Sequence, residues 1–355
     1  MTINISDITK SLIGRNLYNK HETVYKFSHT TLSEKIFIAI HSTVRGPAVG
    51  GCRYFYYEDE QQALDDVLKL SNAMTYKTAM ANLPLGGAKA VIMKDPNTKK
   101  SPELMEFFAE CLEACKGQYY SGEDVGITSD DIDEVLKHTK YSLGSSSESG
   151  DPSYMTALGT FMGIKTAWNY KTGSKSLRDV KIAVQGLGAV GYKLCEMLYK
   201  AGAFLYVSDI DQTKVNEVII NCRAVQLIHD DIKYTNAEIF VPCAMGGIID
   251  DTFISNYKSN LKIIAGCANN QLASRDVGDY LRNNGIIYAP DYVINAGGVI
   301  NVASELMDNK YSKISVLERL KVIPENLNFI FEIADTMWAP TDKVADIMAM
   351  SRIKH

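Results

Sequence analysis

A glycine-rich turn between a buried strand and a helix constrains the fold of this chain more than any other feature. The apolar run at 180–184 leads into GLGAVG at 186–191, and a helical pattern follows. Gly186 permits the tight turn, Gly188 lets a pyrophosphate approach the backbone, and Gly191 allows the helix to pack closely on the strand. In this context the fingerprint predicts a Rossmann-type unit that binds a dinucleotide.

A carboxylate at the end of the next apolar strand refines the prediction. Asp209 follows the run at 203–208, eighteen residues after Gly191. Such a carboxylate accepts hydrogen bonds from ribose hydroxyls and repels a 2′-phosphate, so it favours NAD over NADP. The alternative is an ordinary turn aspartate. Ala189 and Val190 join the predicted cofactor site because they belong to the fingerprint, next to the helix whose N-terminus would hold the phosphates.

Strand and helix patterns alternate after about residue 155, which predicts a parallel sheet. The expected strands lie at 181–185, 203–208, 239–241, 263–265 and 286–288, after a helix at 155–170. Loops at 242–247, 266–270 and 295–298 each follow such a strand, where ligands bind in doubly wound folds. Ordinary loops would have similar composition. From these loops and from the preceding helix, the residues expected at the cofactor are Cys243, Ala244, Asn269, Asn295 and Thr156.

A serine- and glycine-rich segment at 141–153 interrupts the apolar periodicity and predicts a hinge. The expected architecture is α/β with two domains. An N-terminal domain would occupy 1–148, and a doubly wound dinucleotide domain would occupy 149–325. The helical pattern at 326–355 is expected to pack back on the first domain.

Two lysines in apolar surroundings suggest chemistry in the first domain. Lys77 lies near the end of a helix expected at about 60–81, and Lys89 lies between a glycine turn at 85–87 and a strand at 90–93. Desolvation of such an ammonium lowers its pKa towards the range of a neutral-pH acid or base. The alternative is a pair of surface lysines whose stems cover apolar surface.

An aspartate between glycines is a third candidate for chemistry. Asp124 stands in SGEDVG at 121–126, between helices expected to end near Gly117 and to start near Ser129. On local grounds it is a turn residue. Together with a desolvated lysine and a nicotinamide site, it becomes a candidate proton carrier.

Composition excludes several classes of partner. The chain has 355 residues, 46% of them hydrophobic, which suffices for two cores, and its net charge of -5 provides no basic field for nucleic acid or anionic membrane. The stretch at 1–16 has no basic segment followed by an apolar run, and the sequence has no apolar run of about 18 residues, so a soluble protein is expected. Seven scattered cysteines predict a reducing cytoplasm, buried thiols and no metal site.

Seven motifs, in order, resemble the glutamate/leucine/phenylalanine/valine dehydrogenase family over about 37–353. They are GPAVGGCR (46–53), MTYKTA (74–79), LPLGGAKAVI (83–92), GEDVG (122–126), GLGAVG (186–191), CANNQL (267–272) and APDYVINAGGVIN (289–301). Several long motifs in one order are more specific than any single motif. The resemblance is strongest to leucine dehydrogenase, followed by phenylalanine and tryptophan dehydrogenases.

The resemblance implies roles for individual residues. The lysine matching Lys77 holds the substrate carboxylate, and the lysine matching Lys89 activates water and polarises the carbonyl. The aspartate matching Asp124 relays protons to and from the amino nitrogen, and the asparagine matching Asn295 orients the substrate. Substrate binding is also expected at Gly50, Gly51, Val49 and Gly122. The first domain would then bind substrate and form the oligomer, with the active site in a cleft between the domains.

Two positions bear on the substrate. Relatives specific for glutamate carry a lysine at the position of Val49, and an apolar valine could not compensate a buried carboxylate. Leucine dehydrogenases usually have alanine at the position of Gly122, whereas phenylalanine dehydrogenases have glycine. Glu123 and the sequence EDVG resemble the leucine type. Tyr154, Met155 and Pro324 depart from the family pattern.

The expected activity is NAD-dependent, reversible oxidative deamination of an apolar L-amino acid, with leucine or another branched-chain amino acid favoured. The alternatives are a phenylalanine or tryptophan dehydrogenase, a non-catalytic NAD-binding regulatory protein, and an NADP-dependent biosynthetic enzyme. The expected partners are the amino acid, its 2-oxo acid and ammonia. The resemblance also implies a homo-oligomer, often an octamer.

Overall fold

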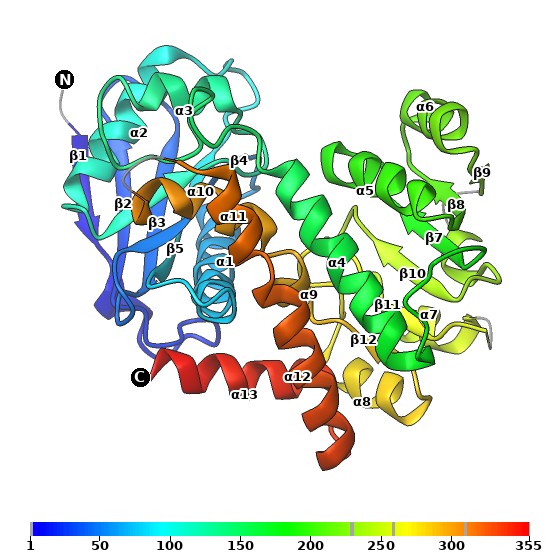
Figure 1. Cartoon of the computed structure of the whole chain (residues 1–355). Helices are drawn as coiled ribbons and strands as arrows, with labels where there is room; N and C mark the ends of the chain where they lie inside the picture. The colour runs from blue at the N-terminus through cyan, green and yellow to red at the C-terminus, as the bar shows by residue number, and fades with distance from the viewer. Residues whose placement is uncertain (1–2, 228–230, 258–259, 309–310, 355) are drawn as a thin grey trace. The chain divides into compact units, whose positions relative to one another are not determined.

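The computed structural model describes residues 3–227, 231–257, 260–308 and 311–354 and divides into two compact units (Figure 1). The first unit comprises Met1–Asp151, Val299–Val316 and Ala349–His355, and the second comprises Pro152–Gly298 and Leu317–Met348. The first boundary lies three residues after the predicted one. On the C-terminal side the division differs from the prediction, because 299–316 group with the first unit and 317–348 with the second.

The first unit is built on a mixed six-stranded sheet in the order β1-β2-β3-β5-β4-β6. The strands β1, β2, β3 and β5 pair antiparallel, whereas β4 runs parallel to both β5 and β6. The strand bounds are Ile3–Asp7 (β1), Thr23–His29 (β2), Lys35–Ser42 (β3), Ala48–Phe55 (β4), Gly86–Met93 (β5) and Tyr119–Gly122 (β6).

Helices α1 (Glu60–Met80) and α2 (Pro102–Ala114) cover opposite faces of this sheet (Figure 1). Side chains alternate along a strand, so Phe37 packs with the α1 residue Val67, while Ile36 packs with the α2 residue Phe108. Both helices begin at side-chain caps, with Asp59 accepting from Gln62 N and Ser101 accepting from Leu104 N. The predicted helix at 60–81 is confirmed.

The second unit contains a fully parallel sheet in the order β12-β11-β10-β7-β8-β9. The chain direction along the sheet reverses between β7 and β10, which is the topological switch point where doubly wound folds bind ligands. The bounds are Lys181–Gln185 (β7), Phe204–Ser208 (β8), Val225–Gln226 (β9), Ile239–Pro242 (β10), Ile263–Ile264 (β11) and Ile287–Tyr288 (β12). The predicted strands are confirmed to within one residue at either end.

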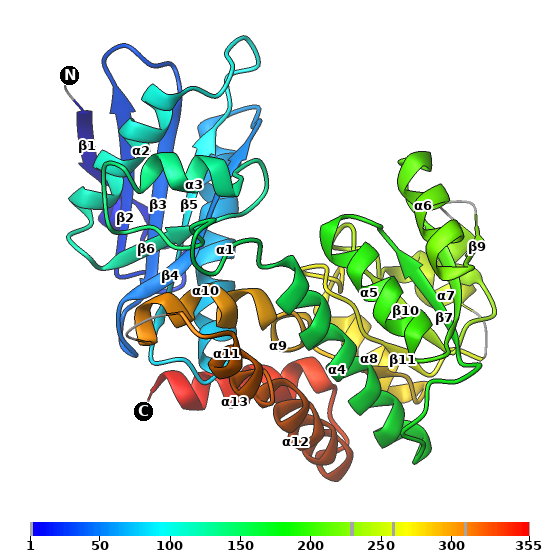
Figure 2. The same cartoon turned by 45° about the horizontal axis from the view of Figure 1, so that its top comes forward.

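Helices flank the second sheet. The side chains of Phe253 (α7) and Leu281 (α8) pack with Phe240 and Ile264 of the sheet. Helix α4 lies beside α5 and α12 (Figure 2). The remaining bounds are Thr9–Leu12 (η1), Ser129–Val135 (α3), Ser153–Thr172 (α4), Ala189–Lys200 (α5), Gln212–Cys222 (α6), Asp231–Tyr234 (η2), Asp251–Asn256 (α7), Arg275–Asn283 (α8), Asp291–Ile294 (α9), Gly297–Met307 (α10), Lys313–Arg319 (α11), Val322–Met337 (α12) and Thr341–Ile353 (α13).

The prediction of a turn before Lys89 is wrong. Strand β5 already begins at Gly86, so Lys89 lies inside the strand rather than at its start. The glycines serve packing: a Cβ on Gly87 would lie 2.1 Å from the backbone nitrogen of Thr75 in α1. Pro324 lies in the first turn of α12, where its missing N–H is tolerated.

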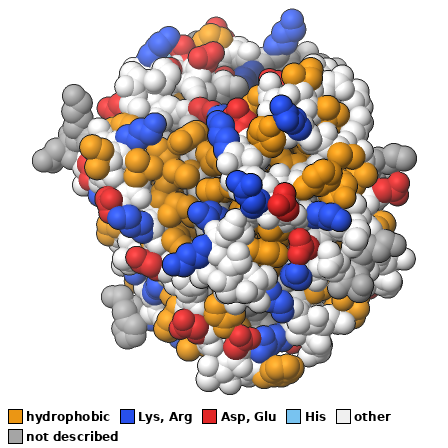
Figure 3. Space-filling model, turned by 45° about the vertical axis from the view of Figure 1, so that its right-hand side comes forward, with side chains coloured by type: hydrophobic (Ala, Val, Ile, Leu, Met, Phe, Trp, Pro, Cys, Tyr) orange, Lys and Arg blue, Asp and Glu red, His pale blue; other side chains and the backbone are white. Residues whose placement is uncertain are grey.

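The surface and the cysteines complete the description. Figure 3 shows lysine, arginine, aspartate and glutamate side chains scattered among apolar ones over one face. Five cysteines are buried and two, Cys243 and Cys267, are partly exposed; all seven are free thiols. Within the described ranges, no helix is long and apolar enough to cross a membrane.

Candidate functional site

Strand pairing in the first unit places several predicted substrate residues on one face of the sheet. Val49 pairs with Gly87, and Gly51 pairs with Gly122. Residues two apart on a strand share a face, so Val49, Gly51, Gly122 and Lys89 all belong to the face on which α1 packs. Val49 and Gly122 therefore lie on neighbouring strands.

Lys77 lies in α1, the helix that packs on this face of the sheet. It belongs to the last helical turn and is half-buried. Two residues earlier, the backbone of Thr75 packs against Gly87 of β5.

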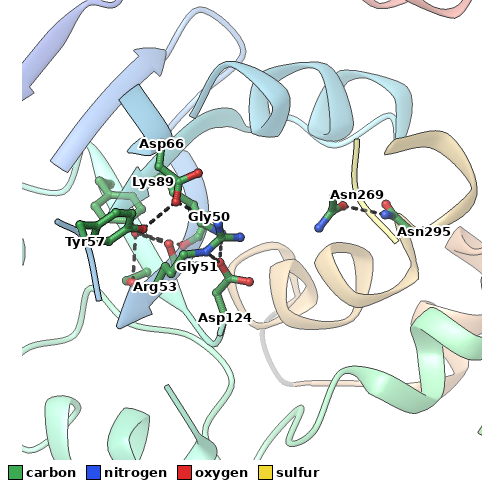
Figure 4. Close-up of polar contacts among 11 residues, drawn as sticks. Gly50, Gly51, Arg53, Tyr57, Asp66, Lys89, Asp124, Asn269 and Asn295 are labelled. Carbon is green, nitrogen blue, oxygen red and sulfur yellow. Dashed lines mark hydrogen bonds and ion pairs between the residues drawn. The ribbon is translucent and has the colours of Figure 1, made fainter. Parts of the chain in front are cut away.

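The buried Lys89 forms an ion pair with the partly buried Asp124 (Figure 4). Lys89 is 6% exposed, and its Nζ lies 2.9 Å from Asp124 Oδ2. Arg53 of β4 donates from Nε to the same oxygen at 3.2 Å. Burial raises the pKa of Asp124, but the Lys89 and Arg53 cations outweigh it and lower that pKa to about 2. The carboxylate is therefore ionised at neutral pH, and the predicted desolvation of Lys89 is accompanied by a compensating charge.

The structure adds three residues that the sequence prediction missed. Arg53 Nη1 also donates to Asp66 Oδ2 at 2.9 Å, and the Tyr57 hydroxyl donates to the same Asp66 oxygen at 2.6 Å. The available signal was an arginine inside the apolar strand pattern at 48–55, where an unpaired cation would be costly. Asp66 and Tyr57 had no local signal, because they meet Arg53 only when α1 packs on the sheet.

The glycine pair Gly50 and Gly51 allows close backbone approach. A Cβ on Gly51 would lie 2.3 Å from the Glu123 carbonyl oxygen, so glycine is needed for the Asp124 loop to approach β4. The Tyr119 hydroxyl lies 3.1 Å from the Gly50 carbonyl oxygen and 3.2 Å from that of Gly51. This buried tyrosine anchors the strand beside Asp124.

In the second unit, the glycine fingerprint has the geometry that a dinucleotide requires. Gly186 has a φ of +97°, and a Cβ on Gly191 would lie 2.0 Å from the Gly186 carbonyl oxygen. A Cβ on Gly188 would meet no described atom within 4 Å. The loop is therefore open at Gly188, at the N-terminus of α5 where Ala189 and Val190 begin the helix.

Asp209 is held against this glycine loop. Its Oδ2 accepts a hydrogen bond from Leu187 N at 2.6 Å, and its Oδ1 accepts from Asp211 N at 2.9 Å. The carboxylate is thus fixed beside the fingerprint, at the end of β8.

The loop after β10 lies beside the fingerprint at the switch point. Cys243 N donates to Gln185 O at 2.7 Å, and Ala244 packs against Gly186. Thr156 in α4 donates from its hydroxyl to Pro152 O at 3.0 Å and packs against Gly298.

Two asparagines predicted to bind the cofactor contact each other (Figure 4). Asn295 Nδ2 donates to Asn269 Oδ1 at 2.8 Å and to Cys267 O at 3.0 Å. Asn295 Oδ1 is buried with no hydrogen-bond partner among the described residues, so it is an acceptor suited to a ligand N–H. Asn295 belongs to the second unit, whereas the other predicted substrate residues belong to the first.

These features fit a nicotinamide dinucleotide. The open loop at Gly188 suits a pyrophosphate, the fixed Asp209 carboxylate suits ribose hydroxyls, and the orphaned Asn295 oxygen suits a carboxamide. In the part of the chain that the structure describes, no group of three or more His, Cys, Asp and Glu side chains could hold a metal ion.

Comparisons with known proteins agree with this arrangement. Residues 21–141 match the model of the Glu/Leu/Phe/Val dehydrogenase dimerisation domain, and residues 207–354 match the model of the Glutamate/Leucine/Phenylalanine/Valine dehydrogenase family. Leucine dehydrogenase of Geobacillus stearothermophilus is 43% identical over 323 residues, covering 90% of this chain and 87% of that protein.

Two further relatives are similar over nearly the whole chain. Phenylalanine dehydrogenase of Bacillus thermotolerans is 40% identical over 364 residues, covering 99% of this chain and 94% of that protein. The crystal structure of L-tryptophan dehydrogenase from Nostoc punctiforme superposes with a TM-score of 0.81 at 38% identity, covering 97% of this chain and 98% of that one. The chain therefore belongs to the glutamate/leucine/phenylalanine/valine dehydrogenase family of oxidoreductases.

Proposed function

We propose that this protein catalyses the NAD-dependent, reversible oxidative deamination of an apolar L-amino acid to its 2-oxo acid and ammonia, with leucine and other branched-chain amino acids favoured. The observation that carries the proposal is the ion pair of the buried Lys89 with Asp124, on a sheet face that also presents the apolar Val49. Two opposite charges within hydrogen-bonding distance and largely shielded from water, beside an apolar side chain, suit acid–base chemistry on an apolar substrate.

Substrate orientation is assigned to Lys77. Its ammonium would hold the α-carboxylate, because the Cα–H bond has to be aligned with the acceptor ring before hydride transfer. Gly50 and Gly51 have no side chains, so they leave room for the substrate beside β4. Asn295 is assigned a further contact to the substrate.

Lys89 and Asp124 are assigned the proton steps. The nicotinamide, when bound, accepts the hydride from the α-carbon. Asp124, which is ionised at neutral pH, takes a proton from the amino group and later returns it to the departing ammonia. Lys89 orients the water that attacks the imine carbon and stabilises the oxygen of the carbinolamine with its positive charge, and the water gives up one proton to solvent as the C–O bond forms. When the C–N bond breaks, the hydroxyl group gives up its remaining proton to solvent and the 2-oxo acid forms.

The cofactor within this family of NAD(P)-dependent dehydrogenases is proposed to be NAD. Asp209 supports NAD, because its carboxylate is fixed next to the glycine loop and would repel a 2′-phosphate. We expect NADP to be a poor substitute for NAD, and we expect Asp209→Ser to reduce the preference for NAD over NADP. The test is kcat/KM for each cofactor; equal use of both by the unmodified protein would contradict the assignment.

Leucine or another branched-chain amino acid is favoured over glutamate because Val49 is buried and apolar. A phenylalanine or tryptophan dehydrogenase is the second candidate. Gly122 supports it, since the absence of a Cβ on the Lys89 face enlarges the space there.

The deciding experiment follows the absorbance of NADH with NAD and a panel of L-amino acids: leucine, valine, phenylalanine, tryptophan and glutamate. We expect turnover with the apolar substrates and none with glutamate. NAD binding without turnover on any member of the panel would favour the non-catalytic regulatory alternative. The same proposal includes a cytoplasmic location and assembly into a homo-oligomer, with an octamer as the expected size. Light scattering measures the oligomeric state.

A further inference from the structure

Behind the Lys89–Asp124 pair lies a chain of contacts that the proposed reaction does not use directly (Figure 4). Arg53 Nε binds Asp124, Arg53 Nη1 binds Asp66, and the Tyr57 hydroxyl binds Asp66. The distances are 3.2, 2.9 and 2.6 Å in that order. The members come from β4, the segment after it, and α1, so the packed fold brings them together.

The guanidinium of Arg53 holds one carboxylate on each of two edges. A planar guanidinium fixes the direction of each N–H, so the two carboxylates are held in a defined geometry that a flexible lysine could not reproduce. The side chains of Arg53, Asp66 and Asp124 are 20%, 26% and 19% exposed. Most of each charged group is therefore shielded from water, and the contacts are stronger than those of surface pairs.

Asp124 depends on such support because it lies in a loop. It follows the short strand β6 and precedes α3. Both cations, Lys89 and Arg53, contact Oδ2 of its carboxylate. Arg53 therefore helps to fix the orientation of the carboxylate.

The four charges also balance. Lys89 and Arg53 are cations, and Asp124 and Asp66 are anions. Burial opposes the charged form of Arg53, but Asp124 and Asp66 outweigh it and raise the pKa of the guanidinium. Burial and the Asp66 hydrogen bond raise the pKa of Tyr57, so its hydroxyl remains a donor.

We infer that Arg53, held in place by Asp66 and Tyr57, is a positioning residue that orients the Asp124 carboxylate for proton transfer. The inference rests on the proposed function of Asp124. Arg53 acts through Asp124 and is assigned no contact with substrate.

The test compares Arg53→Met and Arg53→Lys with the unmodified protein. Arg53→Met should lower kcat about 100-fold, the scale of loss expected from a misplaced catalytic group. It should also move the acidic limb of the pH profile of kcat/KM to higher pH, because Asp124 loses one of the cations that keep it ionised. Arg53→Lys keeps the positive charge but lacks the planar guanidinium that holds two carboxylates. It should therefore keep the pH profile of the unmodified protein but only part of its kcat. NAD affinity should stay within about twofold in both variants, because Arg53 lies in the first unit.

Two further variants, a milder change and a control, test whether the loss of kcat comes from these contacts. Tyr57→Phe removes only the hydroxyl that anchors Asp66 and should lower kcat less than Arg53→Met does. Arg15→Met is the matched control, since Arg15 makes a 3.8 Å pair with Asp65 at the surface of the same unit and should leave kcat and the pH profile unchanged.

The crystal structure of Arg53→Met supplies a readout that does not depend on turnover. We expect the Asp124 carboxylate to leave its position beside Lys89 Nζ; an unmoved carboxylate overturns the inference. An unchanged kcat and pH profile in an active protein overturns it as well. If the unmodified protein turns over no amino acid, the proposed function fails, and the position of Asp124 in the variant still decides the inference. Should Arg53→Met not fold, Arg53→Lys and Tyr57→Phe carry the same comparison.

Discussion

At the residue scale, the central feature is a lysine placed inside a strand and almost completely buried. Lys89 is tolerated there because Asp124 lies at 2.9 Å and compensates its charge. The family resemblance assigned both residues from their motifs, but local sequence could not predict that Arg53 would share the same carboxylate oxygen. That contact depends on β4, β5 and the loop after β6 being side by side.

The first prediction concerns Lys89. We expect Lys89→Ala to lower kcat by about 100- to 10,000-fold, the range typical of a lost acid–base group, and to leave NAD affinity within about twofold. Steady-state rates and a titration of NAD binding measure the two quantities. Lys35→Ala is the control, because Lys35 is a lysine of the same sheet whose side chain is 43% exposed and pairs with Glu60. Activity retained within about tenfold would rule out the assigned role.

A second prediction at this scale concerns Gly122. Among the described atoms, a Cβ at this position would have only the Leu143 carbonyl oxygen within 4 Å, at 3.4 Å, so Gly122→Ala should fold normally. The added methyl group reduces the space for a substrate side chain on the sheet face that carries Lys89. It should therefore shift the leucine-to-phenylalanine ratio of kcat/KM towards leucine. One methyl group in an apolar pocket is worth roughly 1–3 kcal/mol, or about 10- to 200-fold. No shift, or a shift towards phenylalanine, would show that Gly122 does not line the pocket.

At the element scale, prediction from the sequence succeeded where a pattern is local. Five parallel strands of the second unit, β7, β8, β10, β11 and β12, are short apolar runs, and their positions were predicted to within one residue. Strand β9, the two exposed residues Val225–Gln226, was not predicted. Strand β6 was missed because its four residues, Tyr119–Gly122, show no alternation and take their strand geometry from pairing with β4. The glycines before Lys89 resembled a turn, but close packing of α1 requires them in an extended strand.

The glycine fingerprint provides a prediction that separates packing from ligand binding. Gly191→Ala places a Cβ 2.0 Å from the Gly186 carbonyl oxygen, so it should destabilise the second unit by roughly 1–3 kcal/mol. Gly188→Ala meets no described atom within 4 Å and should leave the melting temperature unchanged, but it should weaken NAD binding at least about tenfold. Thermal unfolding and an NAD titration on both variants measure the contrast. If Gly188→Ala binds NAD like the parent, the pyrophosphate does not approach this glycine.

At the scale of the whole molecule, buried ionisable groups govern how the folded state responds to acid. Asp124 stabilises the fold at any pH above the usual carboxyl pKa of 3.8, and this contribution is lost only as pH falls towards about 2. His21 affects the stability of the fold at a higher pH than Asp124 does. It is 2% exposed, its Nε2 lies 3.1 Å from Leu68 O and 3.0 Å from Ser71 Oγ of α1, and its ring meets that of His41 edge-on at 4.8 Å. The sequence contained no signal for this contact between the segment before β2 and α1.

The last prediction concerns this histidine and the stability of the fold between pH 6.5 and pH 4. Burial, together with the neighbouring His41, lowers the pKa of His21 from 6.5 to about 4. Above pH 6.5 His21 is neutral in both the folded and the unfolded state and has no effect. As pH falls from 6.5 to 4, the unfolded state binds a proton that the folded state does not, so the free energy of unfolding decreases. Each pKa unit corresponds to about 1.4 kcal/mol, so the loss approaches about 3 kcal/mol at pH 4.

The test of this prediction is His21→Gln, which keeps a donor for Leu68 O and cannot be protonated. We expect the free energy of unfolding of this variant, measured with urea between pH 6.5 and pH 4, to depend less on pH than that of the parent. The exposed His138 serves as the control, because His138→Gln should leave the parent's pH dependence unchanged. Equal pH dependence in His21→Gln and the parent would show that His21 does not carry the acid sensitivity.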